Sequence, residues 1–179
     1  MSKLGKKPIA IPKDAKVKFE SGKLTLTGPK GSKELSLNDK IFSTKILENN
    51  NLILKLIKKN ESSNVIWGTT RSKINSALIG VTAGHEKILE ITGVGLRAIL
   101  KEPILNLQLG FSHDIAYKIP EGVKLTVEKS TIVKINGIDK ELVGKVAAEI
   151  KMLKPVEPYK GKGIKERGQY ILRKEGKKK

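Results

Sequence analysis

The sequence contains no cysteine and only two histidines, and these absences exclude several kinds of chemistry. Without cysteine the chain can have no disulfide framework, no thiolate zinc site and no cysteine nucleophile. Two histidines are too few for a metal cluster, so we expect neither a metal nor another cofactor. The composition is compatible with a reducing compartment.

Long apolar runs are also missing. The sequence has no stretch typical of a transmembrane helix and no strongly amphipathic basic helix that would lie on a membrane surface. Residues 1–8 are basic, but the continuous apolar stretch of a secretory signal does not follow them. We therefore expect no membrane partner, and a location in the cytoplasm or in an organelle descended from a bacterium.

Positive charge is present in large excess. The chain has 36 Lys and Arg against 18 Asp and Glu, which gives a net charge of +18 and an isoelectric point near 10.0. When basic residues neutralise the phosphates of a polyanion, condensed counterions are released, and this release favours binding. The surplus of positive charge therefore favours nucleic acid as the partner. Only four of the 36 basic residues are arginines, at positions 71, 97, 167 and 173. Because bidentate reading of base edges relies on arginine, we expect recognition of RNA shape and backbone. An AT-rich coding sequence is the alternative explanation for the excess of lysine over arginine.

Candidates for a catalytic or nucleotide site do not fit the chemistry. His113 lies between Ser112 and Asp114, but neighbours in a turn do not project toward one another as a catalytic triad requires. His85 is interpreted as a solvated linker residue. Gly93-Val94-Gly95 and Gly161-Lys162-Gly163 both lack the rest of a nucleotide-binding fingerprint. We expect no catalytic residue and no small-molecule substrate; a hydrolase that uses His113 is an alternative that His113→Ala would test.

The two halves of the sequence repeat one pattern. Ile11-Pro12 precedes an alternating apolar segment that ends at Gly28, and Ile119-Pro120 precedes a matching segment, with one inserted residue, that ends at Gly137. Such alternation predicts hairpins of half-buried strands. Each hairpin is associated with a helix-period segment, around residues 66–74 and 142–150. The repeat predicts an α+β fold made of two similar domains, each a mainly antiparallel sheet with one principal helix.

The second helical segment has the clearer boundaries, because Asp139 is a good N-cap and Pro155 stops the helix. Gly68 and Gly144 occupy equivalent positions in the two segments. Since glycine in a helix costs about 1 kcal/mol relative to alanine, we expect both helices to approach their sheets closely there. Turn residues delimit further strands, which we expect at residues 33–37, 42–47, 52–57, 87–91, 97–101, 105–109 and 115–119.

The expected domains are 1–82 and 83–155, joined by a short linker near residues 81–85. The remaining residues, 156–179, are rich in Gly, Lys and Pro and have almost no apolar periodicity. We interpret them as a basic extension that is mobile in the absence of a polyanion, because its like charges repel.

Basic clusters are the candidates for RNA binding. The densest runs from Lys154 to Arg167, where Gly161 and Gly163 let backbone amides approach phosphates and Tyr159 offers a ring for a sugar or base. For any single lysine, a solvated charged surface is the alternative. The predicted RNA-binding residues are Lys3, Lys6, Lys7, Lys30, Arg71, Arg97, Lys154, Tyr159, Lys160, Gly161, Lys162, Gly163, Lys165, Arg167, Arg173, Lys174, Lys177 and Lys178.

A series of motifs spans the chain almost end to end, at residues 5–9, 28–31, 93–98, 109–113, 119–123, 137–150 and 155–164. In this order, the motifs resemble those of the bacterial form of large-subunit ribosomal protein six. The chain departs from the family pattern at Val156, Leu96 and Lys165-Glu166. These departures leave open whether individual contacts of the family, such as stacking just after Ile164, are made here, but they do not affect the resemblance.

This resemblance implies a duplicated α+β fold, binding to large-subunit (23S-class) rRNA and no catalysis. It further implies a place near the base of the factor-binding stalk and the sarcin–ricin region, next to other large-subunit proteins, with the C-terminal domain making much of the rRNA contact. A general nucleic-acid-binding or RNA-chaperone protein is the competing hypothesis, and stoichiometric presence in salt-washed large subunits would separate the two.

Overall fold

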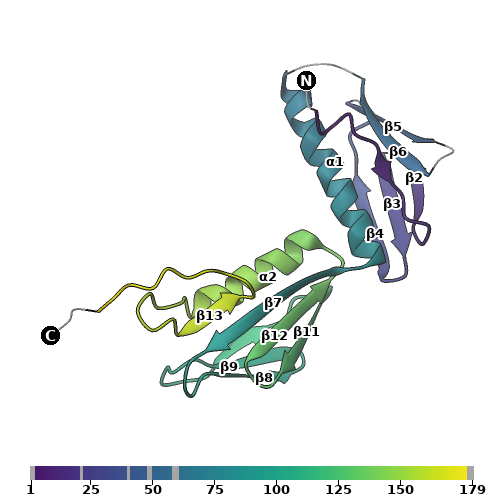
Figure 1. Cartoon of the computed structure of the whole chain (residues 1–179). Helices are drawn as coiled ribbons and strands as arrows, with labels where there is room; N and C mark the ends of the chain where they lie inside the picture. Colours follow the sequence, from purple (N-terminus) through teal and green to yellow (C-terminus); the bar gives the residue numbers. More distant parts are fainter. Residues whose placement is uncertain (1–2, 21, 40, 48–49, 58–60, 177–179) are drawn as a thin grey trace. The chain divides into compact units, whose positions relative to one another are not determined.

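The computed structural model describes residues 3–20, 22–39, 41–47, 50–57 and 61–176 (Figure 1). It divides the chain into two compact units, Met1–Gly84 and His85–Lys179. Both combine mainly antiparallel sheets with one principal helix, which confirms the expected α+β class and duplication.

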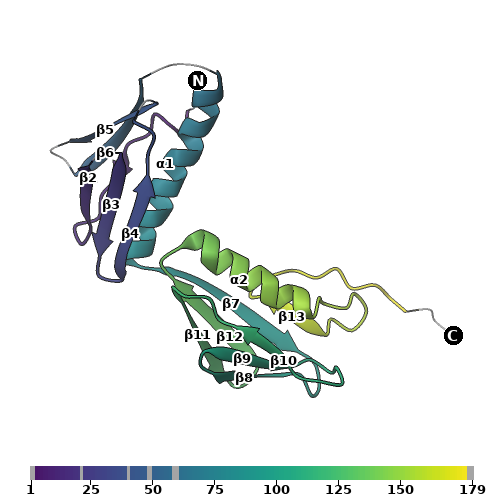
Figure 2. The same ribbon diagram turned by 180° about the vertical axis from the view of Figure 1, so that it is seen from behind.

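Strands precede the helix in the N-terminal unit. Its described elements are, in order, β1 (Ile9–Ala10), β2 (Lys16–Glu20), β3 (Lys23–Gly28), β4 (Gly31–Ser36), β5 (Phe42–Leu47), β6 (Asn51–Leu56) and α1 (Glu61–Thr82). The strands form two antiparallel sheets, ordered β1-β6-β5 and β2-β3-β4. α1 packs against β3, β4 and β6 (Figures 1 and 2). Leu24, Leu26, Ile74 and Leu78 are buried where helix and strands meet, as the alternation in β3 and the helical period predict.

The hairpin turn between β3 and β4 lies against the end of α1. The backbone N–H of Lys30 donates to the Val81 carbonyl at 2.9 Å, which gives a partner to one of the last carbonyls of the helix. A Cβ added at Gly28 would lie 2.4 Å from the same oxygen, so only glycine fits there. The Gly-Pro-Lys-Gly motif therefore has a structural role, while the Lys30 side chain is exposed.

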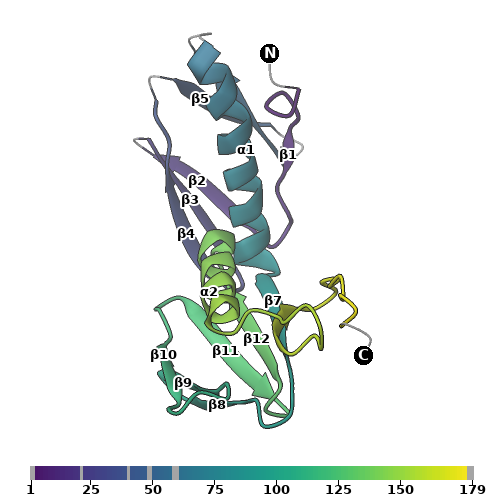
Figure 3. The same ribbon diagram turned by 90° about the vertical axis from the view of Figure 1, so that its left-hand side faces the viewer.

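The C-terminal unit begins directly with a strand and has one principal helix near its end. Its described elements are β7 (His85–Thr92), β8 (Arg97–Lys101), β9 (Ile104–Gln108), β10 (Ile115–Lys118), β11 (Val123–Glu128), β12 (Ile132–Gly137), α2 (Lys140–Leu153) and β13 (Gly163–Glu166). They form a four-stranded antiparallel sheet, β11-β12-β7-β13, and a smaller one, β10-β9-β8 (Figure 3). Each of the seven short strands expected from the sequence is present, with ends shifted by at most two residues.

One core joins both sheets of this unit to α2. It combines Leu89 and Val133 of the four-stranded sheet with Leu107 of the smaller sheet and Val143 and Ile150 of α2. Because side chains alternate along a strand, the intervening residues of β7, β11 and β12 point to the opposite face of the four-stranded sheet. We call that side, away from the core, the open face.

Two polar contacts fix α2. Asp139 caps it as expected, since its carboxylate accepts a hydrogen bond from the Glu141 N–H at 3.1 Å. The Tyr117 hydroxyl on β10 donates to the Glu149 carboxylate on α2. Burial, and then the neighbouring carboxylate, raise the pKa of Tyr117, so the phenol stays protonated and ties β10 to the helix.

The structure differs from the sequence analysis in the expected extension 156–179. Gly163–Glu166 is a strand, β13, that pairs antiparallel with β7, and the Ile164 side chain is fully buried in the core. The expectation of an extension without core contacts is wrong for these residues. The division between Gly84 and His85 falls within the expected linker at residues 81–85, but the linker is shorter than expected, because α1 continues to Thr82. His85, interpreted as a solvated linker residue, is instead the first residue of β7 and pairs with Gly137.

The expected close approach of α2 to its sheet at Gly144 is wrong. A Cβ added there would meet nothing within 4 Å. We therefore predict that Gly144→Ala raises the free energy of unfolding by about 0.5 to 1 kcal/mol, because alanine is the better helix former. Urea unfolding measures the change. Gly137→Ala is the control with opposite sign, since its Cβ would lie 2.7 Å from Val143; a destabilised Gly144→Ala variant would contradict the prediction.

Candidate nucleic-acid interface

Three loops meet at one end of the C-terminal unit. They connect β7 to β8 (93–96), β9 to β10 (109–114) and α2 to β13 (154–162). The strand register brings them together, because Thr92 at the end of β7 pairs with Gly163 at the start of β13, and Arg97 at the start of β8 pairs with Gln108 at the end of β9. We call these loops, with Arg97, the loop cluster.

Short distances join the three loops. A Cβ added at Gly93 would lie 3.7 Å from Lys162 Cβ, and one added at Gly110 would lie 3.8 Å from the Leu96 side chain. The Lys154 ammonium lies 4.7 Å from the centroid of the Phe111 ring, a cation–π contact between the second and third loops. The loops therefore form one surface.

The loop cluster combines cations with exposed apolar groups. Arg97, Lys160 and Lys162 are exposed, and Tyr159 is 54% exposed. Phe111 is 48% and Val94 95% exposed, although neither was predicted from the sequence. Cations bind phosphates, and exposed rings stack on unpaired bases, so this mixture is typical of RNA recognition. In the sequence, Val94 and Phe111 are marked only as apolar residues next to glycine in a turn.

Hydrogen bonds hold the third loop in shape. The Glu157 N–H donates to the Lys162 carbonyl at 2.8 Å, and the Gly161 N–H donates to the Glu157 carbonyl at 3.0 Å. Downstream, the Lys174 N–H donates to the Pro158 carbonyl at 3.0 Å, and the Arg173 guanidinium packs against Gly161. Part of the tail thus folds back on the loop and brings Arg173 and Lys174 beside it.

Other predicted residues lie elsewhere in the C-terminal unit. Lys165 and Arg167 do not belong to the loop cluster. The Lys165 ammonium lies 3.3 Å and the Arg167 Nε 3.4 Å from the carboxylate of Glu90, which points to the open face. The predicted cluster 154–167 is therefore split between two surfaces.

The remaining predicted residues belong to the N-terminal unit or lie outside the described chain. Arg71 holds the N-terminal segment, because its guanidinium donates to the carbonyls of Lys7 at 3.1 Å and Pro8 at 3.3 Å. The side chains of Lys3, Lys6 and Lys7 are exposed on that segment. Lys177 and Lys178 lie outside the described residues.

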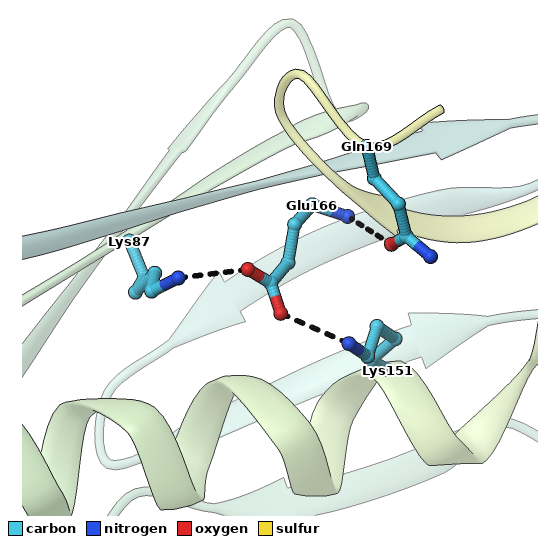
Figure 4. A network of polar contacts seen from close by, with 4 residues as sticks. All are labelled: Lys87, Lys151, Glu166 and Gln169. Carbon is cyan, nitrogen blue, oxygen red and sulfur yellow. Dashed lines mark hydrogen bonds and ion pairs between the residues drawn. The ribbon is translucent and has the colours of Figure 1, made fainter. Parts of the chain in front are cut away.

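Glu166 binds β13 to its neighbours on the side opposite the open face (Figure 4). Its carboxylate accepts from Lys87 of β7 at 2.8 Å and from Lys151 of α2 at 2.9 Å. The Glu166 N–H donates to the Gln169 side chain. The hydrogen bonds from Lys87 and Lys151 lower the pKa of Glu166 below its ordinary value. Glu166 therefore anchors the strand that follows the third loop.

A pH-dependent loss of stability is predicted for Glu166→Gln. Because the folded pKa is depressed, the ion pairs stabilise the fold above the unfolded pKa of about 4.3 and are lost as pH falls through the folded pKa. At pH 7 the variant should lose up to about 1 kcal/mol of unfolding free energy, and the loss should shrink as the pH falls from about 4.3 toward about 3, through the depressed folded pKa. Urea titrations across that range measure it, with exposed Glu121→Gln as the control. An equal loss at every pH would contradict the role of the charge.

In the ranges that the structure describes, no group of three or more His, Asp or Glu side chains could hold a metal ion. No helix within those ranges is both long and apolar enough to cross a membrane.

Comparison with known proteins decides the family. The sequence model of ribosomal protein L6 matches residues 92–167. The large ribosomal subunit protein uL6 of Novosphingobium aromaticivorans is 45% identical over 179 residues, which cover all of both chains. The chain belongs to the ribosomal protein L6 family. Two further uL6 proteins are also 45% identical: that of Zymomonas mobilis over 100% of both chains, and that of a Nitratiruptor species over 99% of this chain and 98% of its own.

The L6 match confirms the resemblance seen in the sequence motifs. The residues matched by the L6 model contain all three loops of the loop cluster and also β13. L6 proteins are structural ribosomal proteins and not enzymes, which confirms the expectation that the chain is not an enzyme.

Proposed function

We propose that the chain is a structural constituent of the large ribosomal subunit and supports translation by binding large-subunit rRNA through the loop cluster. The proposed place is near the stalk base and the sarcin–ricin region of 23S-class rRNA, beside neighbouring large-subunit proteins, in the cytoplasm. The observation that carries the proposal is the convergence of three loops that gather Arg97, Lys160 and Lys162 with two exposed rings.

The loop cluster suits a folded RNA better than a regular duplex. Lysines and Arg97 can neutralise phosphates from neighbouring backbone segments, and this part of the binding energy is strongly salt-dependent. Tyr159 and Phe111 offer ring faces to unpaired bases, which occur in rRNA loops and bulges. The hydrogen bonds within the third loop hold these groups in place before binding, so little ordering entropy is lost.

A general nucleic-acid-binding protein or RNA chaperone is the second candidate, favoured by the net charge of +18. Mass spectrometry of large subunits washed at high salt separates the two. We expect stoichiometric retention in the large subunit, with cross-links from the third loop to the stalk-base region of its rRNA. A protein that washes off completely and spreads over all cellular RNA would be a chaperone.

A further inference from the structure

The open face of the four-stranded sheet carries its own set of charges. Because Leu89, Ile91 and Val133 point into the core, their neighbours Glu90 and Lys134 point to the open face. Lys165 of β13 stands directly opposite Glu90 in the strand register. The open face therefore presents cations next to the RNA-binding loops, on the same rigid sheet.

Carboxylates form ion pairs with Lys134 and Lys165. Glu90 lies between two cations, with Lys165 Nζ at 3.3 Å from one carboxylate oxygen and Arg167 Nε at 3.4 Å from the other. Lys134 Nζ lies 2.6 Å from the Glu128 carboxylate. Glu90 is well placed for this role, since its side chain is only 28% exposed and is held by the strand.

The loop cluster is different. In the described part of the chain, Arg97, Lys160 and Lys162 have no carboxylate within ion-pair distance. A phosphate can bind them without displacing anything. At the open face a phosphate would have to replace Glu90, whose carboxylate would then repel the RNA backbone at close range.

We propose that Glu90 is a specificity-determining residue that keeps RNA backbone off the open face and so directs binding to the loop cluster. It does so by occupying Lys165 and Arg167, two cations that would otherwise form a phosphate site. The inference rests on the proposed RNA binding. The ion pairs thereby remove two of the chain's surplus cations from the set that a polyanion can reach next to the loop cluster.

The test compares two variants that remove the same charge from one face of one strand. Glu90→Gln releases Lys165 and Arg167. Glu86→Gln is the control. Glu86 lies four residues before Glu90 on β7, and within the described chain its carboxylate has no ion pair. Binding to a short random-sequence single-stranded RNA is measured for the full-length protein over a range of salt concentrations.

We expect Glu90→Gln to bind the random RNA about fivefold more tightly near 0.1 M salt, with a salt dependence steeper by up to about 1.4 in the log–log slope, because two cations become available. Glu86→Gln should change the affinity less than about twofold. The triple variant Glu90→Gln, Lys165→Gln, Arg167→Gln should lose the gain. Equal behaviour of Glu90→Gln and Glu86→Gln, or a gain that persists in the triple variant, overturns the proposal.

The outcome is separable from that of the proposed function. If the wild-type protein is absent from large subunits, the proposed function fails whatever the variants do. If the wild type is retained and binds rRNA, but Glu90→Gln binds random RNA no better than Glu86→Gln, only the role of Glu90 fails. Thermal unfolding of each variant verifies folding, and Glu→Gln at these partly exposed positions preserves side-chain shape.

Discussion

Replacement of Arg97, Lys160 and Lys162 by Gln should weaken binding to large-subunit rRNA about 100-fold near 0.1 M salt. Each of the three cations is exposed at the loop cluster, and each phosphate contact contributes roughly 1 kcal/mol near the protein surface. The slope of log affinity against log salt should also fall by about 2 to 3, because fewer counterions are released. Filter binding or fluorescence anisotropy with an rRNA fragment measures both quantities.

The matched control removes three charges from the same unit, at the other end of its sheets. Lys101 and Lys118 are the last residues of β8 and β10, which both run away from the loop cluster, and Lys124 is exposed near the start of β11. Their replacement by Gln gives the same net charge, and we expect an affinity loss below about fivefold. If both triple variants lose affinity equally, binding follows net charge and the loop cluster has no special role.

Gly163→Ala should cost about 3 kcal/mol of unfolding free energy and displace the third loop. Gly163 has a φ of 136°, in a region open essentially to glycine alone. An added Cβ would lie 2.7 Å from the Pro155 carbonyl oxygen and 2.9 Å from Val156 Cα. These are backbone atoms that cannot move without shifting the loop, so steric strain adds to the conformational cost.

Gly168→Ala separates the two contributions. Gly168 also has a positive φ, 80°, but a Cβ there would meet nothing within 4 Å, so we expect a loss of only about 1 kcal/mol. Urea unfolding gives the free energies, and hydrogen exchange of the Ile164 amide, which donates to the Lys154 carbonyl, reports on the loop. Equal stability of Gly163→Ala and the wild type would show that the loop adapts without cost.

The sequence predicts most of the strands and α2 because local signals mark them. Alternation in Leu24-Thr25-Leu26 predicts β3, and Asp139 and Pro155 set the limits of α2 within a few residues. The strand β13 has no such signal. It is four residues long, and one large apolar side chain, Ile164, anchors it to the core. Its pairing with β7 is a tertiary contact, which overrides the low strand propensity of Gly163, Lys165 and Glu166.

The functional surface is predicted only in part for the same reason. Composition alone identifies the third loop, through Tyr159 and its neighbouring lysines. Val94 and Phe111 join it because the register of β7, β8 and β9 brings distant loops to one end. Arg71 and Lys165 illustrate the reverse, since the sequence shows their charge but not the carbonyls or the carboxylate that the fold places beside them.

The pairing of β13 with β7 has a consequence for synthesis. A ribosome makes the chain from its N-terminus, so β7 exists long before β13 emerges. Until then, β7 is an unprotected edge whose free backbone groups can pair with another nascent chain. The N-terminal unit can mature early, whereas the four-stranded sheet is completed only after Gly163–Glu166 has been synthesised. Premature termination before Gly163 should therefore yield an aggregation-prone fragment rather than a shortened working protein.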